Sequence, residues 1–139
     1  MAFDSTSLRV EVVSADGLIW EGDAVSVIAR TVEGDIGVLA NHEPMLALLV
    51  PGAAEILSTA GTREIVAVDG GFLSVSNNRV ALLSSYAVMA KEISEPEAER
   101  ELAAAQKRLD DGDVSTETMQ HFHRASAQVK AAAKAAGAR

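Results

Sequence analysis

The three histidines of this chain are its best candidates for metal binding or acid–base chemistry, and their spacing limits what they can do. His121 and His123 stand two positions apart. On a helix, two such side chains point about 200° away from each other, so they do not share a metal ion as an i, i+4 pair would. We therefore expect two partly solvated helix histidines, and we predict no metal site and no resident cofactor.

Glutamates alternate at the start of a predicted helix, at Glu95, Glu97, Glu99 and Glu101. A helix distributes alternate residues over different faces, so this pattern indicates a solvated first turn rather than an acid–base pair. Negative charge in that turn is stabilised by the helix dipole.

Motif searches also argue against a catalytic site. The sequence contains no GxxxxGK(S/T) phosphate loop, no GxGxxG turn and no GxSxG elbow. It contains no cysteine, which excludes a disulfide framework and a Cys-ligated zinc site. We therefore predict a protein that is not an enzyme.

Residues 33–46 are neither plain strand nor plain turn. Glycines at 34 and 37 indicate a tight bend, and Pro44 fixes its own φ and biases Glu43 towards extended backbone. One interpretation is a structural loop in which His42 is hydrogen-bonded locally. The other is an exposed loop that presents acidic and polar groups to a partner. A small enzyme that uses His42 as a base is a third, weaker alternative, because no nucleophile or carboxylate stands at a recognisable spacing.

The charge of the chain limits its partners. The formal net charge is −8, and phosphate-backbone binding needs clustered Lys and Arg, so nucleic acid is excluded. Residues 1–93 hold 5 basic and 12 acidic side chains, whereas residues 94–139 hold 7 and 8, which indicates two parts with different partners. The N-terminus lacks an apolar signal-peptide region, and no apolar stretch approaches the roughly 20 residues of a membrane span. We expect a soluble protein, so that if it works at a membrane something else must hold it there.

The first 91 residues have the pattern of short strands separated by turns. Leu8, Val10 and Val12 alternate with polar residues, a period of two that places one face on a core. The pattern predicts an antiparallel β-sandwich over residues 1–91, with turns at Pro51-Gly52, Asp69-Gly70-Gly71 and Asn77-Asn78. The predicted strands are 8–12, 19–20, 24–31, 36–39, 53–58, 64–68, 72–76 and 79–84.

The period changes near residue 94 and predicts a two-helix hairpin over residues 92–139. Ser94 begins a capping box with Glu97, and Asp113 or Ser115 can cap a second helix after the Gly112 loop. The fold class is therefore α+β, a sandwich followed by an antiparallel helical hairpin. The predicted apolar stripe of the second helix is Met119, Phe122, Ser126, Val129 and Ala133.

Three segments together resemble the epsilon subunit family of F-type ATP synthases. GDIGVLANHEPML at 34–46 is similar to the family's GxxGxxxxHxPLL stretch. VDGGFLSVSNNRVALLSSYA at 68–87 resembles its GGFxEVxxNxVxVLxxxA signature. The N-terminal segment LRVEVVSADG and the predicted C-terminal hairpin also stand where the family has them along the chain. The resemblance covers nearly the whole chain.

The resemblance implies a rotor subunit on the cytoplasmic face of the bacterial plasma membrane. Its sandwich would bind the gamma subunit and the c-ring, and its hairpin could extend into the alpha/beta catalytic head to block ATP hydrolysis. By position, the c-ring contact falls on Glu33, Gly34, Asp35, His42, Glu43 and Met45. The inhibitory cations of the second helix would be Arg124, Lys130 and Lys134, since this helix is the only cationic element.

A nucleotide-sensing hairpin is the main alternative function. Some bacterial members bind ATP there through an acidic residue and an Arg three positions later. Glu97 and Arg100 keep that spacing, and Arg124 could complete the set. An i, i+3 Glu–Arg pair is also common on helix surfaces, so the pattern leaves both interpretations open.

Overall fold

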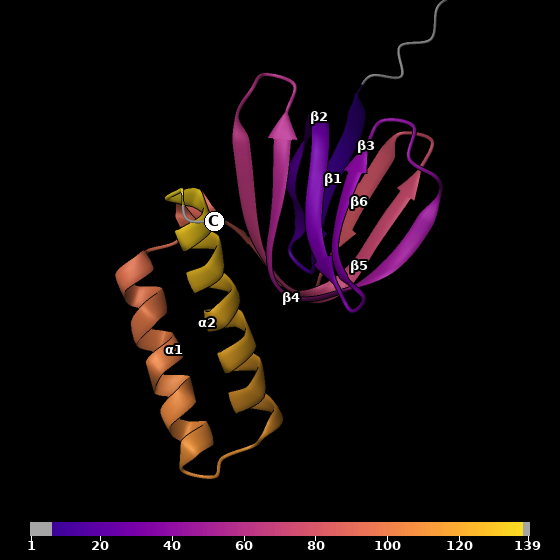
Figure 1. Ribbon diagram of the computed structural model, residues 1–139. Coiled ribbons are helices and arrows are strands. Elements are labelled where there is room, and N and C mark those ends of the chain that lie inside the picture. Colours follow the sequence, from indigo (N-terminus) through magenta and orange to yellow (C-terminus); the bar gives the residue numbers. More distant parts are fainter. Residues whose placement is uncertain (1–6, 138–139) are drawn as a thin grey trace, which may run out of the picture.

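The computed structural model describes residues 7–137, and it confirms the predicted α+β fold class (Figure 1). Strands occupy the N-terminal part and two long helices the C-terminal part, joined by a single 3₁₀ turn, η1 (Ala90–Glu92). The strands are β1 (Leu8–Ser14), β2 (Gly17–Thr31), β3 (Gly34–Leu39), β4 (Met45–Ser58), β5 (Arg63–Ser76), β6 (Arg79–Leu83) and β7 (Ala87–Met89). The helices are α1 (Glu95–Asp110) and α2 (Thr116–Ala135).

The strands form a sheet that closes on itself. Its order is β1-β6-β5-β4-β2-β3, and β1 also pairs with β2, so five strands surround one core while β3 and β7 lie at the edges. The β1–β6 pairing is parallel, and the other pairings among the described strands are antiparallel. The core is made of alternating inward residues, among which Val10, Val12 and Val27 are completely buried.

Two predicted turns are wrong, because the chain bends within long strands instead of leaving the sheet. Pro51 pairs with Asp69, and Gly52 pairs with Val68, so β4 and β5 remain hydrogen-bonded through the bend. Gly71 has a φ of 104°, and a Cβ there would lie 1.9 Å from the Leu83 carbonyl oxygen. Glycine therefore allows a close backbone approach inside one strand. The two strands predicted on either side of Gly71, 64–68 and 72–76, are parts of the single strand β5.

The Asn77-Asn78 turn and the helix caps at Ser94 and Ser115 are confirmed, whereas of the predicted capping box only the bond to the Ser94 hydroxyl is present. Asn77 and Asn78 have φ of 51° and 62°, which suits the two-residue turn that joins β5 to β6. The Ser94 hydroxyl accepts from the Glu97 amide at 3.4 Å, and the Ser115 hydroxyl accepts from the Thr118 amide at 3.3 Å. These side-chain acceptors satisfy first-turn amides and define where α1 and α2 begin.

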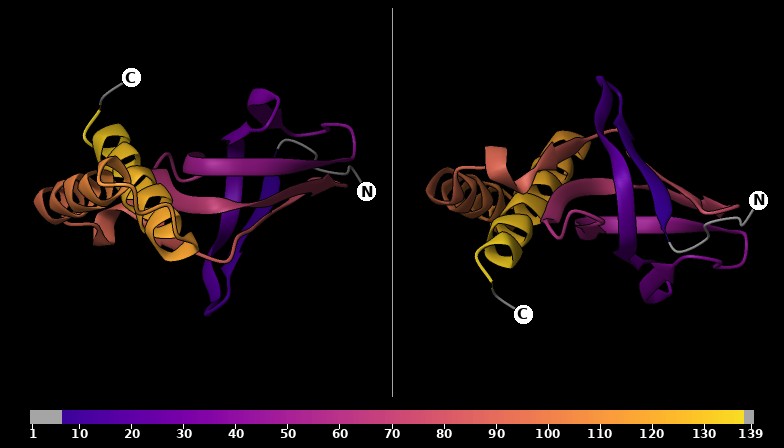
Figure 2. Two further views of the ribbon diagram at one scale, coloured as in Figure 1. Left: turned by 90° about the horizontal axis from the view of Figure 1, so that it is seen from below. Right: turned by 90° about the horizontal axis from the view of Figure 1, so that it is seen from above.

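The predicted apolar stripe of α2 is wrong in its register. Met119 is 36% exposed, whereas the buried residues of α2 are Thr118, Ala125, Ala127, Ala131 and Ala132. The cause is that α2 has two neighbours: it packs against α1 on one side and against β4 and β5 on another, as Figure 2 shows. A helix between two partners buries small residues around much of its circumference rather than one stripe.

Candidate functional site

The contact between α2 and the sandwich is small and is lined by alanine. Ala127 and Ala131, both 0% exposed, pack with Ile65 and Ala67 of β5 and with Ala90 of η1. Alanine contributes little apolar area per residue, so this contact stabilises the docked hairpin less than a contact made by larger side chains would. Polar contacts between α2 and the sandwich add to this apolar contact.

Arg124 makes the most elaborate of these polar contacts. Its Nε donates to Asp69 Oδ2 of β5 at 3.1 Å, and its guanidinium carbon lies 4.8 Å from the centre of the Tyr86 ring. The Asp69 side chain is only 12% exposed, so the pair is more shielded than a surface ion pair. The predicted inhibitory cation is thus held by the sandwich in this docked form.

Two further hydrogen bonds join α2 to the sandwich, one at the β6–β7 loop and one at β5. Gln128 Nε2 donates to the Tyr86 hydroxyl. Arg63 Nη1 donates to the Lys134 carbonyl at 2.9 Å, near the end of α2, while its Nη2 bonds Glu55 at 2.8 Å. Together with Arg124, these groups hold α2 at three points along its length.

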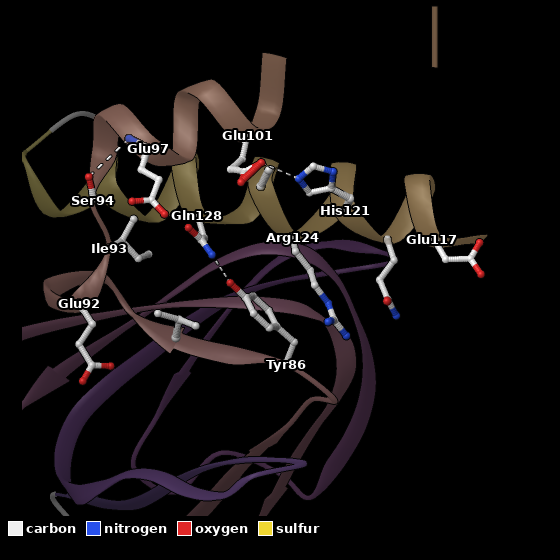
Figure 3. A pocket seen from close by; sticks show the side chains of 13 residues that line it. Tyr86, Glu92, Ile93, Ser94, Glu97, Glu101, Glu117, His121, Arg124 and Gln128 are labelled. Carbon is white, nitrogen blue, oxygen red and sulfur yellow. Dashed lines mark hydrogen bonds and ion pairs between the residues drawn. The ribbon is translucent and has the colours of Figure 1, made fainter. Parts of the chain in front are cut away.

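A cavity of about 580 Å³ lies between α1, α2 and the chain around Tyr86 (Figure 3). His121 Nε2 and Glu101 Oε2 are 3.0 Å apart across it, and this pair links the two helices. The acidic residues of its lining are Glu92, Glu97, Glu101 and Glu117. His123 is not among the lining residues, and no group of three or more His, Asp or Glu among residues 7–137 is arranged to hold a metal.

The nucleotide-binding residues considered from the sequence meet only in part. Glu97 and Arg124 line this cavity, but Arg100 does not. The cavity lining contains four glutamates but only one arginine, Arg124, which is already paired with Asp69. Such an excess of carboxylates repels a triphosphate, so the charge of the cavity disfavours nucleotide binding.

The predicted c-ring residues divide between the two ends of β3. Glu33, Gly34 and Asp35 form the β2–β3 turn region, and Asp35 is paired with Arg30 at 2.9 Å. His42 and Glu43 lie in the loop after β3, whose Asn41 amide donates to Asn78 Oδ1. The extended residues 36–39 separate Asp35 from the loop after β3 by roughly 13 Å of strand, so the two groups are two surfaces rather than one patch.

His42 is bonded within its own loop. Its Nδ1 lies 2.7 Å from the Glu43 carbonyl oxygen, which can only accept, so Nδ1 carries the proton. This matches the local hydrogen bonding expected of a structural loop. Glu43 is exposed, whereas Met45 begins β4 and packs against the sandwich core.

The sequence interpretation missed an apolar row on the outer face of the sandwich. Leu48 of β4 pairs with Phe72 of β5, which pairs with Leu83 of β6, and the three are 50%, 44% and 41% exposed. Leu46, two positions before Leu48, is 69% exposed. The signal was available, since residues 45–49 are apolar at consecutive positions, and a strand that faces water on one side alternates instead.

Lys130 and Lys134 stand on the last turns of α2, where Lys130 is exposed and Lys134 is half-buried. Both line a second cavity between α2 and the β2–β3 turn. They are separate from Arg124, so the three predicted inhibitory cations differ in how firmly the sandwich holds them.

Comparisons with a family model and with curated proteins point to the same family. The family model described as ATP synthase, Delta/Epsilon chain, beta-sandwich domain matches residues 7–90. The ATP synthase epsilon chain of Cutibacterium acnes is 42% identical over 142 residues, covering 96% of this chain and 97% of that protein. That of Streptomyces coelicolor is 38% identical over 129 residues, covering 93% and 98%.

Solved structures support the fold. A chain of the Euglena gracilis mitochondrial ATP synthase matches with a TM-score of 0.76 at 22% identity, covering 92% of this chain and 81% of that chain. A chain of the Tetrahymena thermophila mitochondrial ATP synthase central stalk and c-ring matches with a TM-score of 0.56 at 16% identity, covering 96% and 98%.

Proposed function

The chain belongs to the delta/epsilon family of ATP synthase chains, as an epsilon chain, and we propose that it is the non-catalytic central-stalk subunit of an F-type enzyme. Its sandwich would connect the gamma subunit to the c-ring, so that proton-driven ring rotation reaches the catalytic head. Its hairpin would inhibit ATP hydrolysis. No helix among residues 7–137 is long and apolar enough to span a membrane. As part of such an enzyme, the chain would bind peripherally at the cytoplasmic face of the bacterial plasma membrane, through its partner subunits.

The apolar row Leu48–Phe72–Leu83 carries this proposal. Large apolar side chains 41–50% exposed, in register across three strands, are typical of a protein interface. The residues of the small core under α2 are different ones, so the hairpin leaves this row open. We assign the row to the gamma subunit.

Co-purification tests this assignment. Phe72→Asp should abolish capture of the chain by the gamma subunit, because a charge at the centre of an apolar interface is left without a partner. Val114→Asp is the matched control: Val114 is 73% exposed, but it lies in the α1–α2 loop. Equal loss of capture in both variants, or in neither, would reject the row as the gamma site.

The c-ring contact is proposed at one of the two ends of β3. Cysteines at Asp35 and at Glu43 test the two ends separately, because roughly 13 Å of strand lies between them. The chain has no cysteine of its own, so any crosslink to a ring-loop cysteine comes from the introduced position. If neither position crosslinks in an intact complex, the proposed ring contact is wrong.

The hairpin is proposed to alternate between this docked form and an extended form that reaches the alpha/beta head. Because only a small alanine contact and a few polar contacts hold the hairpin, we expect the free energy of undocking to be small. Arg124, Lys130 and Lys134 would then face an acidic partner surface. While the hairpin is docked, Arg124 is bound to Asp69, so docking withholds that cation from the head.

The nucleotide-sensor alternative is less well supported. The cavity that contains Glu97 and Arg124 has a surplus of carboxylates, and Arg100 lies outside its lining. ATP affinity of the isolated chain would favour the alternative. An enzyme that uses His42 as a base has equally little support, because His42 Nδ1 is engaged by its neighbour's carbonyl.

A further inference from the structure

A second cavity, of about 460 Å³, lies where the last turns of α2 approach the bend of β4 and the β2–β3 turn. Its charged lining residues are Arg30 and Asp35 from the sandwich and Lys130 and Lys134 from α2. Its volume falls within the roughly 300–1,000 Å³ usual for small-ligand sites. The cavity therefore has room for a ligand that touches both the sandwich and the hairpin.

The charge of this cavity is opposite to that of the chain. Three cations face one carboxylate, a local sum of +2 in a chain of net charge −8. Asp35 is neutralised by Arg30, whose Nε and Nη2 donate to its two oxygens at 2.9 and 3.2 Å. No carboxylate among residues 7–137 is within ion-pair distance of Lys130 or Lys134. Two ammonium groups one helical turn apart thus lack a counter-charge.

The backbone around the cavity leaves room for an anion. Gly52 of the β4 bend lines the cavity, and a Cβ added to it would meet no heavy atom within 4 Å. The partial negative charge at the end of α2 opposes anion binding, but Arg63 satisfies the Lys134 carbonyl there. The other hairpin cavity, with its four glutamates, offers an anion no comparable site.

We propose that this cavity binds a phosphate-bearing anion between Lys130, Lys134 and Arg30. Lysine binds phosphate as a point charge, and two lysines on adjacent turns can meet different oxygens of the same group. Because the ligand touches α2 and the sandwich together, it favours the docked hairpin by mass action. It also occupies two of the cations proposed to act at the catalytic head. This regulatory consequence rests on the proposed function, whereas the binding itself does not.

Titration of the isolated full-length chain with inorganic pyrophosphate, followed by amide NMR in about 50 mM salt, tests the site while screening is weak. Shifts should concentrate at the amides of residues 52–53 and 130–134. Lys130→Ala combined with Lys134→Ala should weaken binding by at least about tenfold, since both charge-assisted contacts are lost. The control, Lys107→Ala with Arg108→Ala, removes the same charge from α1 and should change the affinity by less than about twofold.

A variant with the opposite sign separates a specific site from general attraction. Asp35→Asn removes the only carboxylate of the cavity and frees Arg30, so it should tighten pyrophosphate binding by about threefold or more. A purely structural role of Asp35 would weaken binding instead. The proposal is overturned if the two double variants lose affinity equally, if Asp35→Asn weakens binding, or if shifts bypass the amides of residues 52–53.

The phosphate group could belong to a free anion or to a lipid headgroup. Co-sedimentation with vesicles of phosphatidylcholine and phosphatidylglycerol, lost on changing Lys130 and Lys134, would assign it to a headgroup. Pyrophosphate binding without vesicle binding would assign it to a free anion. Absence of both overturns the site but leaves the family assignment intact, because no partner subunit takes part.

Discussion

Breaking the Arg124–Asp69 pair should undock the hairpin without unfolding the sandwich. The two side chains are 31% and 12% exposed, and their hydrogen bond is 3.1 Å long. A charge-assisted bond in such a partly shielded place is worth about 1–2 kcal/mol, above the range of fully exposed pairs. The stacking of Arg124 on Tyr86 adds about 0.5–1 kcal/mol, which Asp69→Asn leaves in place. Asp69→Asn should therefore raise the opening equilibrium by about 5–30-fold.

The assay uses a single introduced thiol. Ala131 is 0% exposed in the docked form, and the chain has no other cysteine, so the labelling rate of an Ala131→Cys chain reports hairpin opening. Asp69→Asn and Arg124→Gln should each accelerate labelling. The double variant should be little faster than the faster single variant, because both changes break the same bond.

The matched control is Lys107→Ala, which breaks an exposed ion pair with Asp111 inside α1 and should change labelling by less than about twofold. The reasoning is refuted if the effects of Asp69→Asn and Arg124→Gln simply add, with a coupling energy below about 0.3 kcal/mol. It is also refuted if either change unfolds the strands, as judged by circular dichroism.

Three further predictions concern the separate parts of the chain. A chain ending at Lys91 should stay folded by circular dichroism, because the main core cluster lies within Leu8–Met89; an unfolded product would contradict the proposed division at residues 91 and 92. Gly71→Ala should cost about 3 kcal/mol in chemical denaturation, since its Cβ would meet the Leu83 carbonyl, whereas Gly37→Ala, with open space, should stay within about 0.5 kcal/mol. The pKa of Asp113 is lowered by the hydrogen bond from the Thr118 hydroxyl and by those from Ser115. The ionised Asp113 therefore stabilises the fold at pH values above the ordinary pKa of 3.8, and this stabilisation is lost as the pH falls through the lower pKa of the folded state. Asp113→Asn should flatten that acid-side loss in pH-dependent thermal melts, and an unchanged profile would contradict it.

Features that depend on a few neighbouring residues could be predicted from the sequence. The caps at Ser94 and Ser115 and the Asn77-Asn78 turn rest on local hydrogen bonds and backbone preferences. The strand alternation over Leu8–Val12 rests on the period of two, which one buried face imposes.

Features set by distant neighbours could not be predicted in the same way. Gly70 and Gly71 signal a turn locally, but pairing with β4 on one side and β6 on the other keeps them within a single bent strand. The predicted stripe of α2 is misplaced because Ala127 and Ala131 are buried by the surface of β5, and the position of that surface depends on tertiary packing. Asp35 and His42 are close in sequence, yet Asp35 lies near the start of the extended strand β3 and His42 follows its end.

Hydrolysis by the assembled enzyme tests the central claim most directly, because two variants should move it in opposite directions. Deleting residues 115–139 removes the inhibitory helix, so ATP hydrolysis should rise while ATP synthesis changes less. Asp69→Asn keeps every cation of α2 but releases Arg124 from the sandwich, so hydrolysis should fall below the wild-type rate. Rates measured at low salt and without a membrane potential should therefore rank as deletion, wild type and Asp69→Asn in falling order. Equal rates in all three, or a rise with Asp69→Asn, would contradict the account of a docked hairpin that inhibits when released.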